Sequence, residues 1–463
     1  MTDRIPTGSK RLDEILHGGL PKNAINLIAG VPGSGKTILS QQIVFHNATA
    51  EHPALYLSTL SEPLDKILRY GQSLTFFDQA ALRDGRVIYD DIGQQLGEGG
   101  LDEVLAAIDR YLKDIQPGMV VIDSFRAFHA MAADNSAFRL FLYGLLRRLT
   151  ASATTSIWNA PYVRSEILDQ AEAAVADSIL AFDVKRVAER EVRVVQVLKL
   201  RGSSYQSGEH LYRITEGGFD VFPRLAETRI EARYELRDDH TATGITALDE
   251  LLDNGGYWAG ATTLIAGPSG IGKTLMGLHF LYYGAHTGEP GILATFQENE
   301  TQLSRIVSSF GWSIDDPNVH ILSRRLGEMN IDEWVYELIE LAEKTGAKRI
   351  VVDSLLDLMS AAGDPVRFRE WIFSMTQRFT RQGVSLMMIV EVPDLFQLHR
   401  ISDQAISHLA DNVVLLQYTQ EGPELARALT VLKTRAMHHR PVVHRYEITE
   451  KGFVLGDVLS LDR

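Results

Sequence analysis

Short, nearly apolar runs alternate with longer amphipathic segments along the first half of the chain. The apolar runs are AINLIAG (24–30), ALYLST (54–59), MVVID (119–123), TTSIWNA (154–160) and ADSILAFD (176–183), and the helices predicted between them cover 36–50, 102–115 and 137–152. Such runs predict strands buried on both faces, as in a parallel sheet covered by helices. The later segments VRVVQVLKL (192–200) and HLYRITEGGFDVF (210–222) predict hairpin strands at one edge. The pattern therefore predicts an α/β fold with a mainly parallel sheet.

The second half of the chain repeats the first. TGSKRLDEILHGG (7–19) corresponds to TGITALDELLDNGG (243–256), INLIAGVPGSGKT (25–37) to TLIAGPSGIGKT (263–274), VVIDS (120–124) to VVDS (351–354), LKLRG (198–202) to LKTRA (432–436), and YRITEGGF (212–219) to YEITEKGF (446–453). The copies keep their order and lie 230 to 237 residues apart, which indicates a tandem duplication of a domain-sized unit. We predict domains at 1–236 and 237–463, joined by the charged segment 224–240.

Composition and charge narrow the classes of function. The chain has 46 basic and 60 acidic residues, a formal net charge of −14, and no run of basic residues. This balance argues against nucleic acid or an anionic membrane as the main partner. The absence of cysteine excludes disulfides and thiolate metal sites. The N-terminus is charged where a signal peptide needs an apolar run, and the apolar stretches are too short to span a bilayer, so we expect a cytoplasmic protein.

Two glycine-rich stretches carry the strongest chemical signal. GVPGSGKT (30–37) and GPSGIGKT (267–274) both fit G-x-x-x-x-G-K-[ST], and each lies between a predicted strand and a predicted helix, as a phosphate-binding loop requires. Glycines let main-chain amides wrap phosphate oxygens. We predict ATP as the ligand; the alternative is a glycine turn that binds nothing. The predicted contacts come from Gly30, Gly33, Ser34, Gly35, Lys36 and Thr37 in the first loop, and from Gly267, Gly270, Ile271, Gly272, Lys273 and Thr274 in the second.

Oxygen ligands for Mg²⁺ accompany the same motif. Thr37 and Thr274 close the two loops, and Asp123 and Asp353 end the apolar strands VVID and VVD. Hydroxyl and carboxylate oxygens at these places suit Mg²⁺ bound to ATP phosphates. A strand-end cap is the alternative for either aspartate alone.

ATP hydrolysis also needs a carboxylate that orients the attacking water. With HPALYLSTLSEP (52–63) and EPGILATFQENE (289–300) aligned on their prolines, Glu298 is the candidate in the second half. In the first half the candidate is Glu62, displaced by one residue. The alternative for either is an exposed acid that begins the next helix.

A Lys-x-Arg pair is repeated outside the loops. Lys199 and Arg201, like Lys433 and Arg435, are two residues apart in a predicted strand, so the two cations of a pair face the same way. We predict that each pair stabilises the charge of the phosphoryl group transferred on a neighbouring subunit. A solvated strand face is the alternative.

These features resemble the KaiC family, which comprises double-domain ATPases of the RecA-like superfamily and includes the circadian-clock protein. The resemblance rests on the tandem halves, TG-x-x-x-LDE-x-L, the two loops, the Asp-Ser strand ends, and on VVQVLKLRGSSYQSGEHLYRIT, ADNVVLLQY and LARALTVLKTRAMH, which lie outside the generic ATP motifs. It implies two RecA-like P-loop domains in a homohexamer of two stacked rings, with Mg²⁺ and ATP between protomers. It also implies slow ATP hydrolysis in the first ring, autophosphorylation in the second, and a regulatory protein partner in signalling or timing.

The resemblance also points to a phosphoacceptor. The family's phosphoacceptors are an adjacent serine and threonine before the ADNVVLLQY-type strand. Here that place reads AISHLADN, so Ser407 matches the serine and His408 replaces the threonine. The first half has Ala173 and Ala174 at the matching pair, which fits a kinase in the second ring alone. The alternative is that Ser407 is a surface hydroxyl that is never modified.

Three departures from the family pattern limit what the resemblance implies. The two adjacent glutamates of the family are Gln297-Glu298 in the second half and Leu60-Ser61 in the first, and only one hydroxyl remains of the paired phosphosite. The sequence ends soon after ITEKGFVL, so we expect a homologue without the C-terminal tail that receives the clock protein's activating partner. Two other functions stay open: a RecA-like DNA-handling ATPase, which the acidity disfavours, and a nucleotide-dependent assembly module with little catalysis.

Overall fold

The computed structural model describes residues 3–59, 64–187, 190–225, 239–252, 255–296, 298–325, 330–392, 409–421, 423–435, 438–439, 441–450 and 452–459. The chain divides into two compact units, 1–228 (domain 1) and 229–463 (domain 2). The predicted boundary between 236 and 237 falls in 226–238, outside the described residues. None of the described helices has the length and apolarity needed to span a bilayer.

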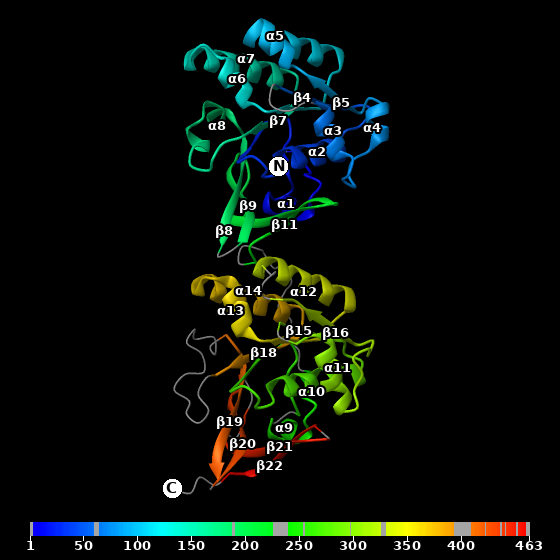
Figure 1. Cartoon of the computed structure of the whole chain (residues 1–463), viewed down its shortest axis with the longest axis vertical. Helices are drawn as coiled ribbons and strands as arrows, with labels where there is room; N and C mark the ends of the chain where they lie inside the picture. Colours follow the sequence, from blue (N-terminus) through cyan, green and yellow to red (C-terminus); the bar gives the residue numbers. More distant parts are fainter. Residues whose placement is uncertain are drawn as a thin grey trace. The chain divides into compact units, whose positions relative to one another are not determined.

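Domain 1 contains, among the described residues, a two-stranded sheet of β1 and β2 and a nine-stranded sheet in the order β11-β10-β9-β8-β3-β7-β6-β4-β5. Figure 1 labels several of its strands and helices. The described strands of the domain are β1 (Arg4–Ile5), β2 (Leu20–Pro21), β3 (Ile25–Gly30), β4 (Ala54–Ser58), β5 (Val87–Asp91), β6 (Met119–Asp123), β7 (Thr155–Ala160), β8 (Ser178–Val187), β9 (Arg190–Leu200), β10 (Glu209–Thr215) and β11 (Gly218–Phe222). Its helices are α1 (Lys10–Ile15), α2 (Lys36–Asn47), α3 (Leu64–Gly71), α4 (Gln79–Arg83), α5 (Gly93–Asp114), α6 (Arg126–Met131), α7 (Asn135–Ala151), the 3₁₀ turn η1 (Ile167–Asp169) and α8 (Ala171–Val175). The strands from β8 to β5 are parallel, and β9, β10 and β11 add antiparallel pairs at the β8 side.

Domain 2 repeats this arrangement, with the described strands of its large sheet in the order β16-β15-β17-β18-β14-β19-β20-β21-β22. Its strands are β12 (His240–Thr241), β13 (Tyr257–Trp258), β14 (Thr262–Gly267), β15 (Gly291–Thr295), β16 (Val319–Ser323), β17 (Arg349–Asp353), β18 (Ser385–Glu391), β19 (Asn412–Glu421), β20 (Glu424–Lys433), β21 (Val443–Thr449) and β22 (Gly452–Val458). Its helices are α9 (Thr246–Leu251), α10 (Lys273–His286), α11 (Glu300–Ser309), α12 (Ile331–Thr345), α13 (Leu355–Ala362) and α14 (Pro365–Arg381). The predicted mainly parallel sheet with hairpin strands at one edge is confirmed in both domains.

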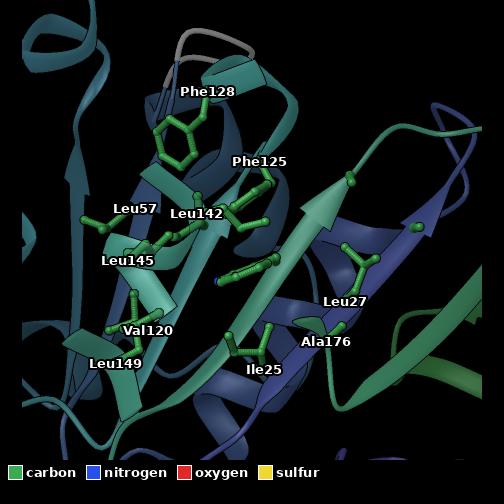
Figure 2. Close-up of a cluster of buried hydrophobic side chains, with 14 of the residues drawn as sticks. Ile25, Leu27, Leu57, Val120, Phe125, Phe128, Leu142, Leu145, Leu149 and Ala176 are labelled. Atoms are coloured by element: carbon green, nitrogen blue, oxygen red, sulfur yellow. The ribbon is translucent and has the colours of Figure 1, made fainter. Parts of the chain in front are cut away.

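Alternate residues of the buried strands face two separate cores, one on each side of the sheet. In β3, Ile25 and Leu27 belong to the core beneath α5 and α7, whereas Ile28 belongs to the core beneath α1 and α2. Figure 2 shows Leu142 and Leu145 of α7 in the first of these cores. Burying a leucine contributes about 1.5–3 kcal/mol, so two filled cores hold the sheet rigid between helix layers.

The structure also contains elements that the apolar pattern does not reveal. Strand β5 lies at the sheet edge and is half exposed, so it lacks the continuous apolar run of a central strand. Helix α5 begins at Gly93, nine residues before the predicted 102. Its first part is rich in glycine, and the helix kinks at Gly100, where φ is 65°. Glycine lowers helix propensity, which hides this first part from a pattern search.

Candidate functional site

Each glycine-rich stretch forms a loop between the central strand of its sheet and the helix that follows. In domain 1 the loop leaves β3 at Gly30 and enters α2 after Gly35, whose φ of 87° is left-handed; Gly272 precedes α10 with φ 107°. A Cβ on Gly30 would lie 2.4 Å from the main-chain oxygen of Phe182. Only glycine meets both requirements, so the local sequence fixes a loop whose helix N-terminus is suited to an anion.

The loop lysines lie back over their own loops. Lys36 Nζ donates to the main-chain oxygens of Gly30 and Val31 at 2.8 and 3.0 Å, and Lys273 Nζ donates to that of Pro268 at 2.7 Å. Burial lowers the pKa of both ammonium groups, and nearby carboxylates oppose this shift. Lys273 is buried and Lys36 is partly buried, and a cation held in this way over a helix N-terminus can hold phosphate oxygens.

A threonine and an aspartate meet at each loop. Thr37 Oγ1 donates to Asp123 Oδ2 at 2.7 Å, and Thr274 Oγ1 donates to Asp353 Oδ2 at 2.6 Å. Burial raises the pKa of Asp353. In domain 1 the hydroxyl of Tyr56 also donates to Asp123 Oδ2, at 2.7 Å. Paired hydroxyl and carboxylate oxygens are hard ligands, so the residues present fit Mg²⁺ bound together with ATP phosphates.

Glu298 follows β15 and lies close to this pair in domain 2. Its side-chain Oε2 is buried and has no hydrogen-bond partner among the described residues. Burial and the charge of Asp353 both raise its pKa. Asn299, the next residue, caps α11 by accepting from the Gln302 N–H at 2.9 Å. The helix therefore has its cap without Glu298, and a buried carboxylate oxygen remains for a ligand.

Three residues of the predicted site lie outside the described residues: Glu62, the candidate carboxylate of domain 1, and Ser407 with its neighbour His408. Their predicted roles stay predictions. Domain 1 does show the first-half counterpart of the phosphosite, since Ala173 and Ala174 lie in α8.

The Lys-x-Arg pairs hold the same positions in both domains. Lys199 Nζ donates to the main-chain oxygens of Ala173 and Ala174 at 3.0 and 3.1 Å, and Arg201 forms an ion pair of 3.1 Å with Asp177. In domain 2, Lys433 Nζ donates to Ala410 O at 2.6 Å, and Arg435 pairs with Asp411 at 3.1 Å. The arginines lie just past the ends of β9 and β20, not within the predicted strands, and their side chains are 58% and 70% exposed. Exposure of this kind leaves both guanidinium groups accessible from outside the domain.

Sequence reasoning missed a contact that ties the edge hairpin to the phosphate loop. The hydroxyl of Tyr212 donates to Ser34 O at 2.5 Å, and that of Tyr446 donates to Ile271 O at 2.6 Å. These tyrosines begin the repeated segments YRITEGGF and YEITEKGF, which were clear as repeats but carried no sign of their partners. A buried Tyr hydroxyl on a main-chain oxygen fixes the loop from outside its own strand and helix.

The sequence also matches known proteins over both domains. The profile described as "ATPase: KaiC" matches residues 5–226 and 241–458. The chain belongs to the KaiC family of ATPases. This confirms the resemblance inferred from the repeats and the predicted fold of two tandem RecA-like domains.

KaiC relatives align with nearly the whole chain. The "Circadian clock oscillator protein KaiC" of Picosynechococcus sp. is 27% identical over 473 residues, which cover 98% of this chain and 90% of the relative. The protein of the same name from Thermostichus vulcanus is 28% identical over 472 residues, 98% of this chain and 89% of its own. The "Circadian clock protein KaiC3" of Synechocystis sp. is 26% identical over 471 residues, 98% and 92% respectively.

Proposed function

We propose that this KaiC-family chain hydrolyses Mg-ATP at its phosphate loops and that domain 2 is the better equipped of its two sites. The observation that carries the proposal is Glu298, whose buried carboxylate oxygen has no described partner and lies near the Thr274–Asp353 pair. A carboxylate in that place can orient and deprotonate the water that attacks the terminal phosphate.

Each site residue of domain 2 has its own proposed role. The loop amides and Lys273 bind and orient the phosphates, and Thr274 and Asp353 would hold Mg²⁺, which neutralises charge on the transferred group. Glu298 accepts a proton from the attacking water. Its raised pKa makes it a better base than an ordinary glutamate once it is ionised. Domain 1 offers the same loop and metal residues, with Glu62 as its proposed carboxylate.

A single-site assay tests the role of Glu298. Lys36→Ala silences the first loop in the full chain, and phosphate release then reports on domain 2. In that background we expect Glu298→Gln to lower the rate by about 10²–10⁴, because the amide cannot accept the proton. Glu300→Gln is the matched control, since Glu300 is exposed two residues away in the first turn of α11. Turnover equal to that of the control would refute the role.

We further propose a homohexamer in which Lys433 and Arg435 act on the ATP of a neighbouring protomer. The exposed side chain of Arg435 supports this, and so does the identical placement of Arg201 in domain 1. With Lys36→Ala present throughout, we expect Lys273→Ala protein and Lys433→Ala/Arg435→Ala protein each to be inactive. Mixed, they regain part of the activity, because some interfaces combine an intact loop with intact cations. No recovery in ATP-bound oligomers confirmed by light scattering would place the cations in cis.

Autophosphorylation of Ser407 is the second proposed activity, supported by the KaiC relatives and by the sequence before ADNVVLLQY. The same protein incubated with Mg²⁺ and γ-labelled ATP should acquire label at Ser407, located by mass spectrometry and absent in Ser407→Ala. Released phosphate with an unlabelled chain would leave an ATP-driven protein whose output is conformational.

A further inference from the structure

A cavity of about 520 Å³ lies in domain 1, away from its phosphate loop. It is lined by the turns before β3, β6 and β7 and by the C-terminal end of α2. The phosphate loop lies at the opposite ends of β3 and α2, because parallel strands all begin at one edge of the sheet and end at the other. The volume is in the range of small-molecule sites, and the cavity is separate from the proposed ATP site.

The described lining of this cavity is basic. Arg4, Lys22 and His52 line it, and no aspartate or glutamate is among its described lining residues. Within the described part of the chain, no carboxylate forms an ion pair with Arg4 or Lys22. Cations gathered without carboxylates are unexpected in a chain of net charge −14, and they favour an anionic ligand.

In domain 2 the side chain of Arg349 fills the place that corresponds to this cavity. Arg349 begins β17 as Met119 begins β6, and its side chain is only 2% exposed. Its guanidinium donates to the main-chain oxygens of Ala242 and Phe280 at 2.7 and 2.8 Å and to a carboxylate oxygen of Glu289 at 2.7 Å. The duplicated fold thus has an internal ion pair at this place in domain 2 and an open, basic cavity in domain 1.

In domain 1 a side-chain amide in the cavity wall provides the hydrogen bonds that Arg349 provides in domain 2. Asn47 occupies the position of Gly284, and its Nδ2 donates to Pro6 O and Ile43 O, both at 2.8 Å. These are the counterparts of the two main-chain oxygens that Arg349 contacts in domain 2. A Cβ on Gly284 would lie 2.4 Å from Arg349 Cδ, so the two solutions exclude each other. Asn47 in the cavity wall thus supplies a donor to Pro6 O, and Ile43 O also keeps its hydrogen bond within α2, so the centre stays open without leaving either oxygen unpaired.

The backbone round the cavity is unusual as well. Of the four described non-glycine residues with positive φ, three line it: Asn23, Gln116 and Ala153, with φ of 52°, 53° and 51°. The corresponding turns of domain 2 have glycine, at Gly260, Gly346 and Gly383. Side chains are disfavoured in this left-handed region, and such residues cluster at binding sites. Domain 1 therefore keeps side chains around the cavity where glycine would fit the backbone better.

We propose that this cavity binds a small organic phosphate. The two fixed charges of Arg4 and Lys22, with His52, match a phosphate group that carries close to two negative charges. The side-chain amides of Asn23 and Gln116 would hydrogen-bond to the body of the ligand. ATP itself is accounted for by the loops at the other edge of the sheet, so this is a separate ligand of the same domain.

Calorimetry on the full chain tests the proposal. Both phosphate loops are first saturated with Mg²⁺ and a non-hydrolysable ATP analogue. The protein is then titrated with 3-phosphoglycerate, with inorganic phosphate and with glycerate, a control that keeps the carboxylate and lacks the phosphate. We expect both phosphates to bind and glycerate not to. Arg4→Gln and Lys22→Gln should each weaken binding about tenfold, the effect of one charge-assisted contact. Lys10→Gln is the matched control, because Lys10 is exposed on α1 and does not line the cavity.

A filled cavity gives the second test. Met119→Arg, Asn47→Gly and His52→Glu together reproduce the residues of domain 2, and we expect them to abolish phosphate binding. Absence of binding to the wild-type chain would overturn the proposal. Binding by Arg4→Gln and Lys22→Gln that is as tight as binding by the wild-type chain would also overturn it. Binding that survives the filling would place the ligand outside the cavity and overturn it too. If the triple variant does not fold, the two charge variants decide alone.

Discussion

Replacing Arg349 by methionine tests how domain 2 uses its internal ion pair. The guanidinium is buried, contacts the main-chain oxygens of Ala242 and Phe280, and pairs with Glu289. Its central carbon also lies 4.6 Å from the centre of the Phe280 ring. Arg349→Met removes these interactions but keeps an apolar stem, and methionine is the residue that domain 1 has at the corresponding position, 119.

The magnitude follows from the partners left behind. The Ala242 oxygen loses its charged donor, which costs about 1–3 kcal/mol, whereas the Phe280 oxygen lies inside α10, keeps its helical hydrogen bond, and loses a second one worth about 0.5–1.5 kcal/mol. The carboxylate of Glu289 is 39% exposed, so losing the ion pair itself adds at most about 1 kcal/mol. We therefore expect domain 2 to lose about 3 kcal/mol of unfolding free energy, the lower end of the range for breaking a buried ion pair.

Urea unfolding followed by tryptophan fluorescence measures this loss in the full chain. Four of the five tryptophans belong to domain 2, and Trp158 is the one in domain 1. In a Trp158→Phe background the emission reports on domain 2 alone. A loss of about 3 kcal/mol should lower the midpoint by roughly 1–2 M urea.

A second substitution separates this explanation from a general loss of packing. Gly284→Asn should destabilise the wild type, because its Cβ meets Arg349 Cδ at 2.4 Å. In the Arg349→Met background the same change should recover about 1–2 kcal/mol, since the new amide can donate to both carbonyl oxygens as Asn47 does in domain 1. The double-mutant cycle isolates that coupling. A loss below 1 kcal/mol for Arg349→Met, or two effects that simply add, would refute the reasoning.

Two further predictions concern domain 2. Tyr446→Phe removes the 2.6 Å hydrogen bond to Ile271 O, so we expect about 1 kcal/mol less stability and weaker binding of a fluorescent ATP analogue; unchanged affinity would show that the loop keeps its shape without the tyrosine. Burial lowers the pKa of His279 to about 4, and the ring nitrogen accepts from the Phe453 N–H at 3.1 Å. The unfolded chain takes up this proton near pH 6.5, so domain 2 should lose stability as pH falls from about 6.5 to about 4. His279→Gln should flatten that part of the urea-midpoint profile, and an identical slope in the variant would assign the titration to another group.

The sequence indicates where those parts of the candidate site lie that are next to each other along the chain or at repeated strand ends, and their roles stay predictions. The loops that end at Thr37 and Thr274 carry their own spacing. Asp123 and Asp353 each end an apolar run, and in each domain the parallel pairing of that strand brings its aspartate to the sheet edge where the loop of the same domain lies. Alignment of the two halves predicts Glu298, because this residue lies only a few positions after the proline that precedes β15.

Other contacts could not be predicted because they depend on tertiary packing. Tyr212 contacts the loop across 178 residues, and no local pattern specifies that distance. The exchange of Arg349 for Met119 looks like an ordinary core difference in an alignment. The structure explains the exchange, because Asn47 in domain 1 and Arg349 in domain 2 donate to corresponding carbonyl oxygens.

The tyrosine contact also sets an order of events during synthesis. A ribosome makes the chain from its N-terminus, at about 5–20 residues per second, and domains tend to fold as they emerge. The loop of domain 1 receives its hydroxyl only when Tyr212 is available, nearly 180 residues after Ser34, so a nascent domain cannot brace its loop until its last hairpin has left the exit tunnel. Domain 1 can thus brace its loop while domain 2 is still being made, and the loop of domain 2 must wait for Tyr446.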